Sequence, residues 1–261
     1  MSIISFRRQD ESFPEIKQSS EHIIDFLLQK EELLEVFSDV LIGVNAYSLT
    51  KKIADSIMSY IGMYPEYEDD LKQLRSLMED YYMYVDDVKF DKRLQEISRY
   101  YRKDHMYLPQ KKLDKIRGIL FETLVEKLIE KRYVNNFGCG CVVLFNGREV
   151  FSRYKGDIRK TIDVAGFDNV DKGEFYECKV TPDSLDEKSY QYLDVLEATL
   201  KSQNDITYIV GCVSAGTQLV LNARKNIIES NLGKYNSKIS LFGLEDILNL
   251  RNKPSLFNMA V

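Results

Sequence analysis

An acidic residue and a lysine two positions apart, inside a strand-like segment, are the clearest chemical feature of this sequence. Residues 175–180 alternate in polarity, so Glu177 and Lys179 fall on one face of a strand and Cys178 falls on the other. The spacing alone is weak evidence, because five acid-x-Lys triplets occur in the chain. Only this one lies in an alternating segment, and a carboxylate beside an ammonium on a half-buried strand suggests a functional site.

A second acid, Asp163, lies between apolar neighbours in the preceding strand-like segment, residues 161–165. If the two segments pair antiparallel, Asp163 comes close to Glu177. Two neighbouring carboxylates repel each other unless a cation lies between them, and oxygen ligands favour Mg²⁺ or Mn²⁺. The pair therefore predicts a divalent-metal site. The alternative, which these strands leave open, is a hairpin closed by an ion pair between Asp163 and Lys179.

A third acid, Glu122, lies on a predicted helix that precedes these strands. It shares a stripe with Gly118, Val125 and Ile129, which places its carboxylate along the inward flank of the helix. Glycine destabilises a helix, so Gly118 suggests a close approach to another backbone. An acid on the inner edge of such a helix is a third candidate for the same site.

Together these elements resemble the nuclease core of the PD-(D/E)xK, or restriction-endonuclease-like, superfamily, in particular its Mrr-like branch. The matching residues are Gly118-x-x-Phe121-Glu122-x-x-Val125-x-x-Leu128, Ile162-Asp163-Val164 and Glu177-Cys178-Lys179. Ile162 stands where the name-giving proline of the family often does. The resemblance covers roughly residues 113–250 and leaves the first 110 residues unexplained.

The resemblance implies an α/β fold, with an αβββαβ core and a mixed sheet. It also implies that Asp163, Glu177 and the backbone carbonyl of Cys178 bind Mg²⁺ or Mn²⁺, that Lys179 helps to activate water, and that Glu122 tunes the metal site. Hydrolysis of a phosphodiester needs a nucleophilic water, neutralisation of the phosphate oxygens and help for the leaving alkoxide. The expected enzyme is a Mg²⁺-dependent endonuclease of restriction or phage defence, and DNA is favoured over RNA as its expected substrate.

The chain divides by pattern into two regions. Residues 1–110 show helical periodicity, and we expect them to form an all-helical recognition or docking region. Residues 111–261, the predicted nuclease domain, change to helix, short strands, helix, strand and helix. The strands are expected at 139–145, 149–154, 159–165, 174–180, 206–214 and 238–242, and the helices at 113–133, 184–202 and 217–231. Asn146-Gly147 predicts a tight hairpin.

Charge is unevenly distributed along the 261 residues. Residues 111–160 carry 12 Lys/Arg and 6 Asp/Glu, whereas residues 1–110 carry 14 and 21. A basic block beside acidic flanks suits a surface that follows phosphates, although an ordinary solvated face gives the same pattern. The tyrosines Tyr81, Tyr82, Tyr84, Tyr100, Tyr101 and Tyr107 could stack on bases or pack between helices.

The remaining composition excludes some classes of protein. The apolar runs are too short to cross a bilayer, so we expect a soluble cytoplasmic protein without membrane contact. The four cysteines lack metal-ligand spacing and are expected to be buried small hydrophobes.

Three functions stay open at this stage. The first is the nuclease, with a partner ATPase or helicase, or a second copy of the chain, as further partners. The second is a non-catalytic protein that keeps the nuclease fold and binds nucleic acid or a partner. The third is a helical interaction protein with a merely structural second domain. Under the first, replacing Asp163 or Glu177 by alanine should abolish cleavage and leave stability unchanged or raised, because like charges repel.

Overall fold

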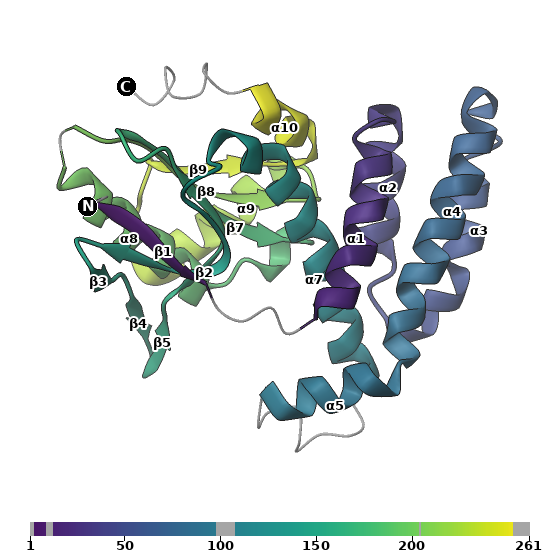
Figure 1. Cartoon of the computed structure of the whole chain (residues 1–261), viewed down its shortest axis with the longest axis horizontal. Helices are drawn as coiled ribbons and strands as arrows, with labels where there is room; N and C mark the ends of the chain where they lie inside the picture. The colour runs from purple at the N-terminus through teal and green to yellow at the C-terminus, as the bar shows by residue number, and fades with distance from the viewer. Residues whose placement is uncertain (1–2, 9–12, 98–107, 204, 253–261) are drawn as a thin grey trace. The chain divides into compact units, whose positions relative to one another are not determined.

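The computed structural model describes residues 3–8, 13–97, 108–203 and 205–252. The chain forms two compact units, one of residues Glu11–Leu124 and one that combines Met1–Asp10 with Val125–Val261 (Figure 1). The predicted boundary at residue 110 therefore differs from the observed division, which falls at residue 124 within a helix. The first residues join the second unit because they form β1 (Ile4–Arg8), which pairs antiparallel with β2 (Phe137–Phe145).

The unit Glu11–Leu124 is built from helices, as its periodicity predicts. They are α1 (Pro14–Leu27), α2 (Leu34–Gly43), α3 (Ile53–Ser59), α4 (Glu68–Tyr82), α5 (Val88–Ile97) and the first part of α7 (Leu108–Ile129), with short 3-10 turns between several of them. Proline at the first position of α1 suits a helix start, because that position has no intrahelical bond to lose. The apolar faces supply the core of this unit.

Two of the tyrosines that the sequence singles out, Tyr81 and Tyr82, are buried within this unit. Tyr81 is fully buried, and its hydroxyl donates to the backbone carbonyl of Ile116 at 2.8 Å. Tyr82 is also buried, and burial raises its pKa. Packing between helices thus accounts for both side chains, while Tyr100, Tyr101 and Tyr107 lie outside the described residues.

The other unit contains a mixed sheet, as predicted for an α/β protein. Its strand order is β1-β2-β6-β7-β8-β9, and β3 pairs with β2. The further bounds are β3 (Arg148–Glu149), β6 (Thr161–Phe167), β7 (Lys172–Lys179), β8 (Thr207–Ser214) and β9 (Ile239–Phe242). The neighbouring strands β1-β2, β2-β6 and β6-β7 pair antiparallel, whereas β7-β8 and β8-β9 pair parallel.

Two turns shape the segment between β2 and β6. Asn146 and Gly147 have φ of 51° and 76°, which makes the predicted tight hairpin between β2 and β3. The predicted strand at 149–154 is wrong in its extent, because β3 ends at Glu149 and a separate hairpin follows, β4 (Ser152–Tyr154) with β5 (Asp157–Arg159). Lys155 and Gly156, with φ of 48° and 90°, form its turn.

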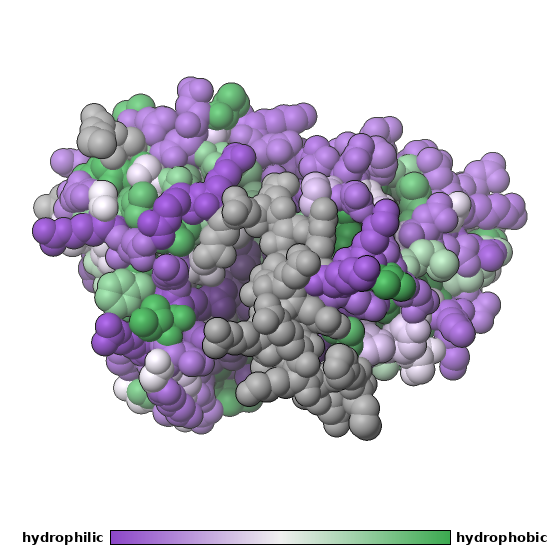
Figure 2. Space-filling model, turned by 60° about the horizontal axis from the view of Figure 1, so that its bottom comes forward, coloured by the Kyte–Doolittle hydropathy of each residue, from purple (hydrophilic) through white to green (hydrophobic). Residues whose placement is uncertain are grey.

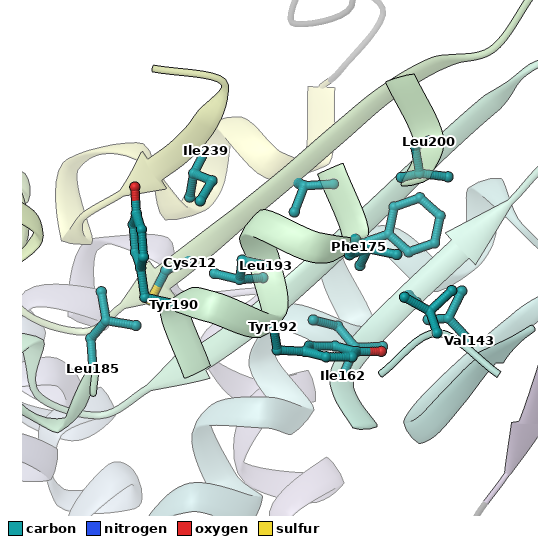
Figure 3. Packing of buried hydrophobic residues seen from close by; sticks show 14 of the residues in the cluster. Val143, Ile162, Phe175, Leu185, Tyr190, Tyr192, Leu193, Leu200, Cys212 and Ile239 are labelled. Atoms are coloured by element: carbon teal, nitrogen blue, oxygen red, sulfur yellow. The ribbon is translucent and has the colours of Figure 1, made fainter. Parts of the chain in front are cut away.

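Helices α8 (Glu187–Lys201) and α9 (Gln218–Leu232) accompany the sheet, and the short α10 (Leu244–Ile247) follows β9. Asp186 caps α8 by accepting the backbone N–H of Ser189 at 2.7 Å, so this helix begins later than the predicted residue 184. Figure 3 shows Tyr192 and Leu193 of α8 in the core that they share with Phe175 of β7. This packing covers the face of β7 on which Glu177 also lies, two residues after Phe175.

Most of the face visible in Figure 2 is hydrophilic, with apolar residues in separate places. Within the described ranges, none of the helices combines the length and the apolar character that crossing a membrane requires.

Candidate active site

Strands β6 and β7 bring Asp163 and Glu177 together. They pair antiparallel with Val164 opposite Tyr176 and Ala165 opposite Phe175, so the next step of this register places Asp163 opposite Glu177. Directly opposed residues project from the same face of a sheet. The strand pairing that the metal-site hypothesis requires is therefore present.

Glu177 is the most deeply buried member of the group. Its side chain is 0% exposed, while those of Asp163, Lys179 and Arg159 are 19%, 17% and 19% exposed. The four residues form what we call the charged cluster. Glu177 is thus shielded from solvent, and the other three members are each partly exposed.

Two cations contact the Glu177 carboxylate. Lys179 Nζ lies 2.7 Å from Glu177 Oε1, and the Arg159 guanidinium donates to the same oxygen. Arg159 Nη2 also lies 3.9 Å from Asp163 Oδ1. Lys179 thus forms an ion pair with Glu177, whereas the alternative hypothesis paired Lys179 with Asp163. The Arg159 guanidinium forms ion pairs with both carboxylates.

A backbone hydrogen bond fixes Asp163 against the neighbouring strand. Its Oδ2 accepts the N–H of Cys178 at 2.8 Å. The bond links the carboxylate to the residue between Glu177 and Lys179, and a charged acceptor makes such a bond stronger than a neutral one. It holds Oδ2 in place and orients the carboxylate toward the cluster.

Two buried polar atoms of the cluster lack a hydrogen-bond partner among the described residues. They are Glu177 Oε2, an acceptor, and Arg159 Nε, a donor. An unsatisfied buried polar group costs about 1–3 kcal/mol, and folded proteins contain few of them. An acceptor suited to a cation and a donor suited to an anion thus lie in one site.

The cations of the cluster stay charged. Burial lowers the pKa of Lys179, but the carboxylates of Glu177 and Asp163 outweigh burial, and the net pKa lies well above the ordinary lysine value. Burial also lowers the pKa of Arg159, but the same two carboxylates raise it by more, so its net pKa is raised. Without metal, Lys179 is therefore an ammonium at neutral pH, which makes it a hydrogen-bond donor and a positive charge.

Asp186 lies near enough to respond to both cations. Burial raises its pKa, but the hydrogen bond from the Ser189 N–H and the charges of Lys179 and Arg159 outweigh burial, so the net pKa is lowered. Asp186 belongs to another acid-x-Lys triplet, at the start of α8.

Glu122 is placed differently from the strand residues. It is half-buried on α7 and belongs to the unit Glu11–Leu124, so it is not among the residues that the sheet unit brings together. The expected close backbone approach at Gly118 is wrong for the described residues. A Cβ there would meet only Glu122 Oε1, at an ordinary 3.7 Å.

Arg159 is the residue that sequence reasoning missed. It precedes Asp163 by four residues and was expected only to begin a strand. Its side chain reaches Glu177, which lies 18 residues further along the chain. The sequence feature that could have identified Arg159 is a basic residue shortly before the strand acid Asp163. This feature is weak, because many surface arginines precede an acid in the same way.

The donor set suits Mg²⁺ or Mn²⁺, which prefer oxygen ligands. Asp163 and Glu177 supply carboxylates, Glu177 Oε2 is unpartnered within the described chain, and the Cys178 carbonyl directly follows Glu177 in sequence. Among the described residues, no group of three or more His, Cys, Asp or Glu side chains could hold a metal ion. A metal would thus rest on two carboxylates and main-chain or substrate oxygens.

Three of the cysteines, Cys141, Cys178 and Cys212, are buried as expected, whereas Cys139 is half-buried. None of the four forms a disulfide with a described residue. Burial raises the pKa of Cys141 to about 12, so its thiol is protonated at neutral pH.

No family model matches this chain, and no curated protein matches it. The structure is similar to the crystal structure of protein VC1899 from Vibrio cholerae, with a TM-score of 0.39 and 12% sequence identity. That similarity covers 98% of this chain and 58% of VC1899, so the chain spans less than two thirds of its length. A likeness of this size leaves the function of this chain to be inferred from its own residues.

Proposed function

We propose that the sheet unit is a Mg²⁺- or Mn²⁺-dependent endonuclease of the PD-(D/E)xK type that hydrolyses phosphodiester bonds in DNA. One observation carries the proposal. Asp163 and Glu177 face each other across β6 and β7 beside Lys179, and the buried Glu177 Oε2 has no partner among the described residues. When the short strands β3, β4 and β5 are left out, the order α7-β2-β6-β7-α8-β8 agrees with the αβββαβ order of the family core, which supports the proposal.

Hydrolysis forms one phosphorus–oxygen bond with water and breaks one to a sugar oxygen, which takes up a proton. A bound divalent cation supplies Lewis-acid stabilisation of the phosphate oxygens and of the leaving oxygen. Asp163 and Glu177 would hold that cation, and the bond from Cys178 N–H keeps Asp163 oriented toward it.

Lys179 contributes as a cation. In the metal-free protein the neighbouring carboxylates raise its pKa, so it is an ammonium that can orient the attacking water and stabilise negative charge on the phosphate. A metal ion on Asp163 and Glu177 would offset the charges that raise this pKa. Both roles that the sequence suggests for Lys179, to orient or to deprotonate the water, therefore remain part of the proposal.

The basic segment 111–160 would help to hold the DNA backbone. A restriction or defence role, a partner ATPase or helicase, and a homo-oligomer remain proposals that follow from the resemblance alone.

A second candidate function has its own support. Arg159 and Lys179 already balance the charges of Asp163 and Glu177, so the cluster is neutral without a metal. Such a cluster also suits a protein that kept the nuclease fold and binds nucleic acid or a partner without turnover.

The test is cleavage of supercoiled plasmid and labelled oligonucleotides by the full chain, with Mg²⁺ or Mn²⁺ and with EDTA. Asp163→Ala and Glu177→Ala should abolish cutting. Lys172→Ala is the matched control, because Lys172 is an exposed lysine at the opposite end of β7. Metal-dependent cutting that survives in Glu177→Ala would refute the assignment, and binding without cutting would favour the second function.

A further inference from the structure

Arg159 enters the charged cluster from a hairpin that is separate from the main sheet. It is the last residue of β5, and one residue separates it from β6. Lys188 of α8 forms an ion pair with Asp157 of the hairpin at 3.2 Å, and Tyr154 donates to Glu187. The backbone that carries Arg159 is therefore anchored, whereas its long side chain can change rotamer.

The guanidinium lies where the two carboxylates need positive charge. It contacts Glu177 Oε1 and lies 3.9 Å from Asp163 Oδ1, so it lies against the same two carboxylates that a metal ion would use. A dication bound to these carboxylates and a guanidinium in contact with them would repel each other strongly at this depth. Both cannot keep their closest contacts at once.

The unpartnered Arg159 Nε indicates where the guanidinium goes. A guanidinium offers five donors in a planar fork that matches the oxygens of a phosphate. Within the described residues Nε donates to nothing, although it is buried. A phosphate oxygen in the cluster would satisfy Nε, just as a metal ion would satisfy Glu177 Oε2.

We propose that Arg159 exchanges partners when the site is loaded: without metal it holds the two carboxylates together, and with metal it leaves them and binds a non-bridging oxygen of the substrate phosphate. This proposal rests on the proposed nuclease function. It makes Arg159 both a competitor of the metal and a substrate ligand, so the site reaches its active charge distribution only when metal and phosphate are both present.

Metal binding tests the first half without any cleavage assay. Mn²⁺ is titrated by calorimetry into the full chain, Arg159→Gln and Arg153→Gln. Arg153 is the control, because it is an exposed arginine of the same hairpin whose guanidinium lies over the Phe151 ring. Arg159→Gln should bind Mn²⁺ about tenfold more tightly, since one competing charge is gone, and Arg153→Gln should bind as the wild type does. Equal affinities in all three proteins would refute the competition and leave the metal site intact.

The absence of Mn²⁺ binding in all three proteins would instead refute the proposed nuclease function. Arg159→Gln leaves Glu177 with fewer partners, so its unfolding temperature is measured first. If it does not fold, a structure of the wild type with Mn²⁺ decides. A guanidinium that has left Glu177 supports the exchange, and one that still contacts Glu177 beside bound Mn²⁺ overturns it.

Steady-state kinetics at saturating Mn²⁺ test the second half. Arg159→Gln should cut DNA about tenfold or more slowly, mainly through the catalytic rate, and Arg159→Lys should recover part of that loss. Cutting by Arg159→Gln at the wild-type rate would show that Arg159 only competes with the metal and does not bind the phosphate.

Discussion

The two faces of β7 each carry a fully buried glutamate, Glu174 and Glu177, and the two differ in how their carboxylate oxygens are hydrogen-bonded. Glu174 receives four hydrogen bonds from three residues: Arg132 donates at 3.1 and 2.9 Å, and the hydroxyls of Tyr133 and Tyr176 each donate at 2.7 Å. Both of its oxygens are satisfied within the protein. Glu177, three residues on, has two cations on Oε1 and no partner for Oε2 among the described residues.

The difference separates a structural carboxylate from a candidate functional one. A buried charge whose every oxygen is paired stabilises the fold only as long as the network is complete. A buried charge that keeps one oxygen unpaired is held at a cost to stability, which is typical of sites that bind a ligand. Burial alone does not distinguish the two glutamates, but their hydrogen-bond partners do.

The largest expected effect is on catalysis. Glu177→Gln should lower the rate of metal-dependent cleavage at least about a thousandfold, since a metal ligand supports several kcal/mol of charge stabilisation. Glu174→Gln, compared per folded molecule, should stay within about twofold of the wild type, because its carboxylate lies on the other face. Single-turnover rates on a labelled duplex measure both, and equal losses in the two variants would erase the distinction between the faces.

The order reverses for stability. Glu174→Gln should lower the free energy of unfolding by about 2–4 kcal/mol, since it leaves the Arg132 guanidinium without its charged partner. Chemical denaturation measures this change, with Glu149→Gln as a control at a more exposed strand acid. Wild-type stability in Glu174→Gln would show that its network is not structural.

The presence of Arg159 also revises what the sequence predicts for Glu177. Like-charge repulsion alone predicts that acid variants are as stable as the wild type or more so. Because Arg159 and Lys179 lie against Glu177, its removal leaves two cations without this partner. Glu177→Ala should therefore be less stable than the wild type in the absence of metal, a direction that thermal unfolding with EDTA can check.

The role of Lys179 as a cation predicts a smaller effect with a graded rescue. Lys179→Met should reduce cleavage about 10²-fold, the usual loss when one donor to a developing oxyanion is removed. Lys179→Arg keeps the charge and should retain part of the activity, which a residue acting as a base could not do. A rate for Lys179→Arg as low as that for Lys179→Met would contradict the cation role.

The sequence predicted the parts of this site that depend on local pattern. Alternation along residues 175–180 placed Glu177 and Lys179 on one face, and Asn146-Gly147 set the β2-β3 turn. These features follow from backbone geometry within a few residues.

What the sequence did not show depends on distant partners. β1 was missed because a five-residue segment becomes a strand here by pairing with β2, more than 130 residues away. Arg159 was missed because its importance lies in the reach of a flexible side chain to another strand. Likewise, no local sequence pattern predicts that both carboxylate oxygens of Glu174 are hydrogen-bonded, whereas Glu177 Oε2 has no partner among the described residues.

Glu122 gives a test of intermediate size. The family resemblance makes it an outer residue of the metal site, and removal of such residues weakens activity or metal affinity about 10–100-fold. Glu122→Gln should therefore cost less than Glu177→Gln and raise the Mg²⁺ concentration needed for half-maximal cleavage. Unchanged rates at limiting Mg²⁺ would assign Glu122 to the helical unit alone, as a half-buried residue of α7.

Asp186 offers the smallest and most specific test, because it is an acid near the cluster whose carboxylate is engaged by the cap of α8. Its lowered pKa means that the folded protein favours the charged form, so its contribution to stability is complete above the ordinary aspartate pKa of 3.8 and is lost as the pH falls through the lower folded value.

Asp186→Asn keeps a good helix cap and removes only the charge. The variant should be less stable than the wild type by about 1 kcal/mol or less at pH 7, and this difference should shrink as the pH falls through the folded pKa of Asp186, which lies below 3.8. Its cleavage rate should stay within about twofold of the wild type, since Asp186 Oδ1 accepts the Ser189 N–H at the start of α8 and an asparagine keeps this cap. Denaturant unfolding from pH 7 to pH 3, together with cleavage rates at pH 7, measures both quantities. A large loss of cleavage with unchanged stability would place Asp186 with Glu177 among the functional acids and show that pairing within the protein does not separate the two kinds.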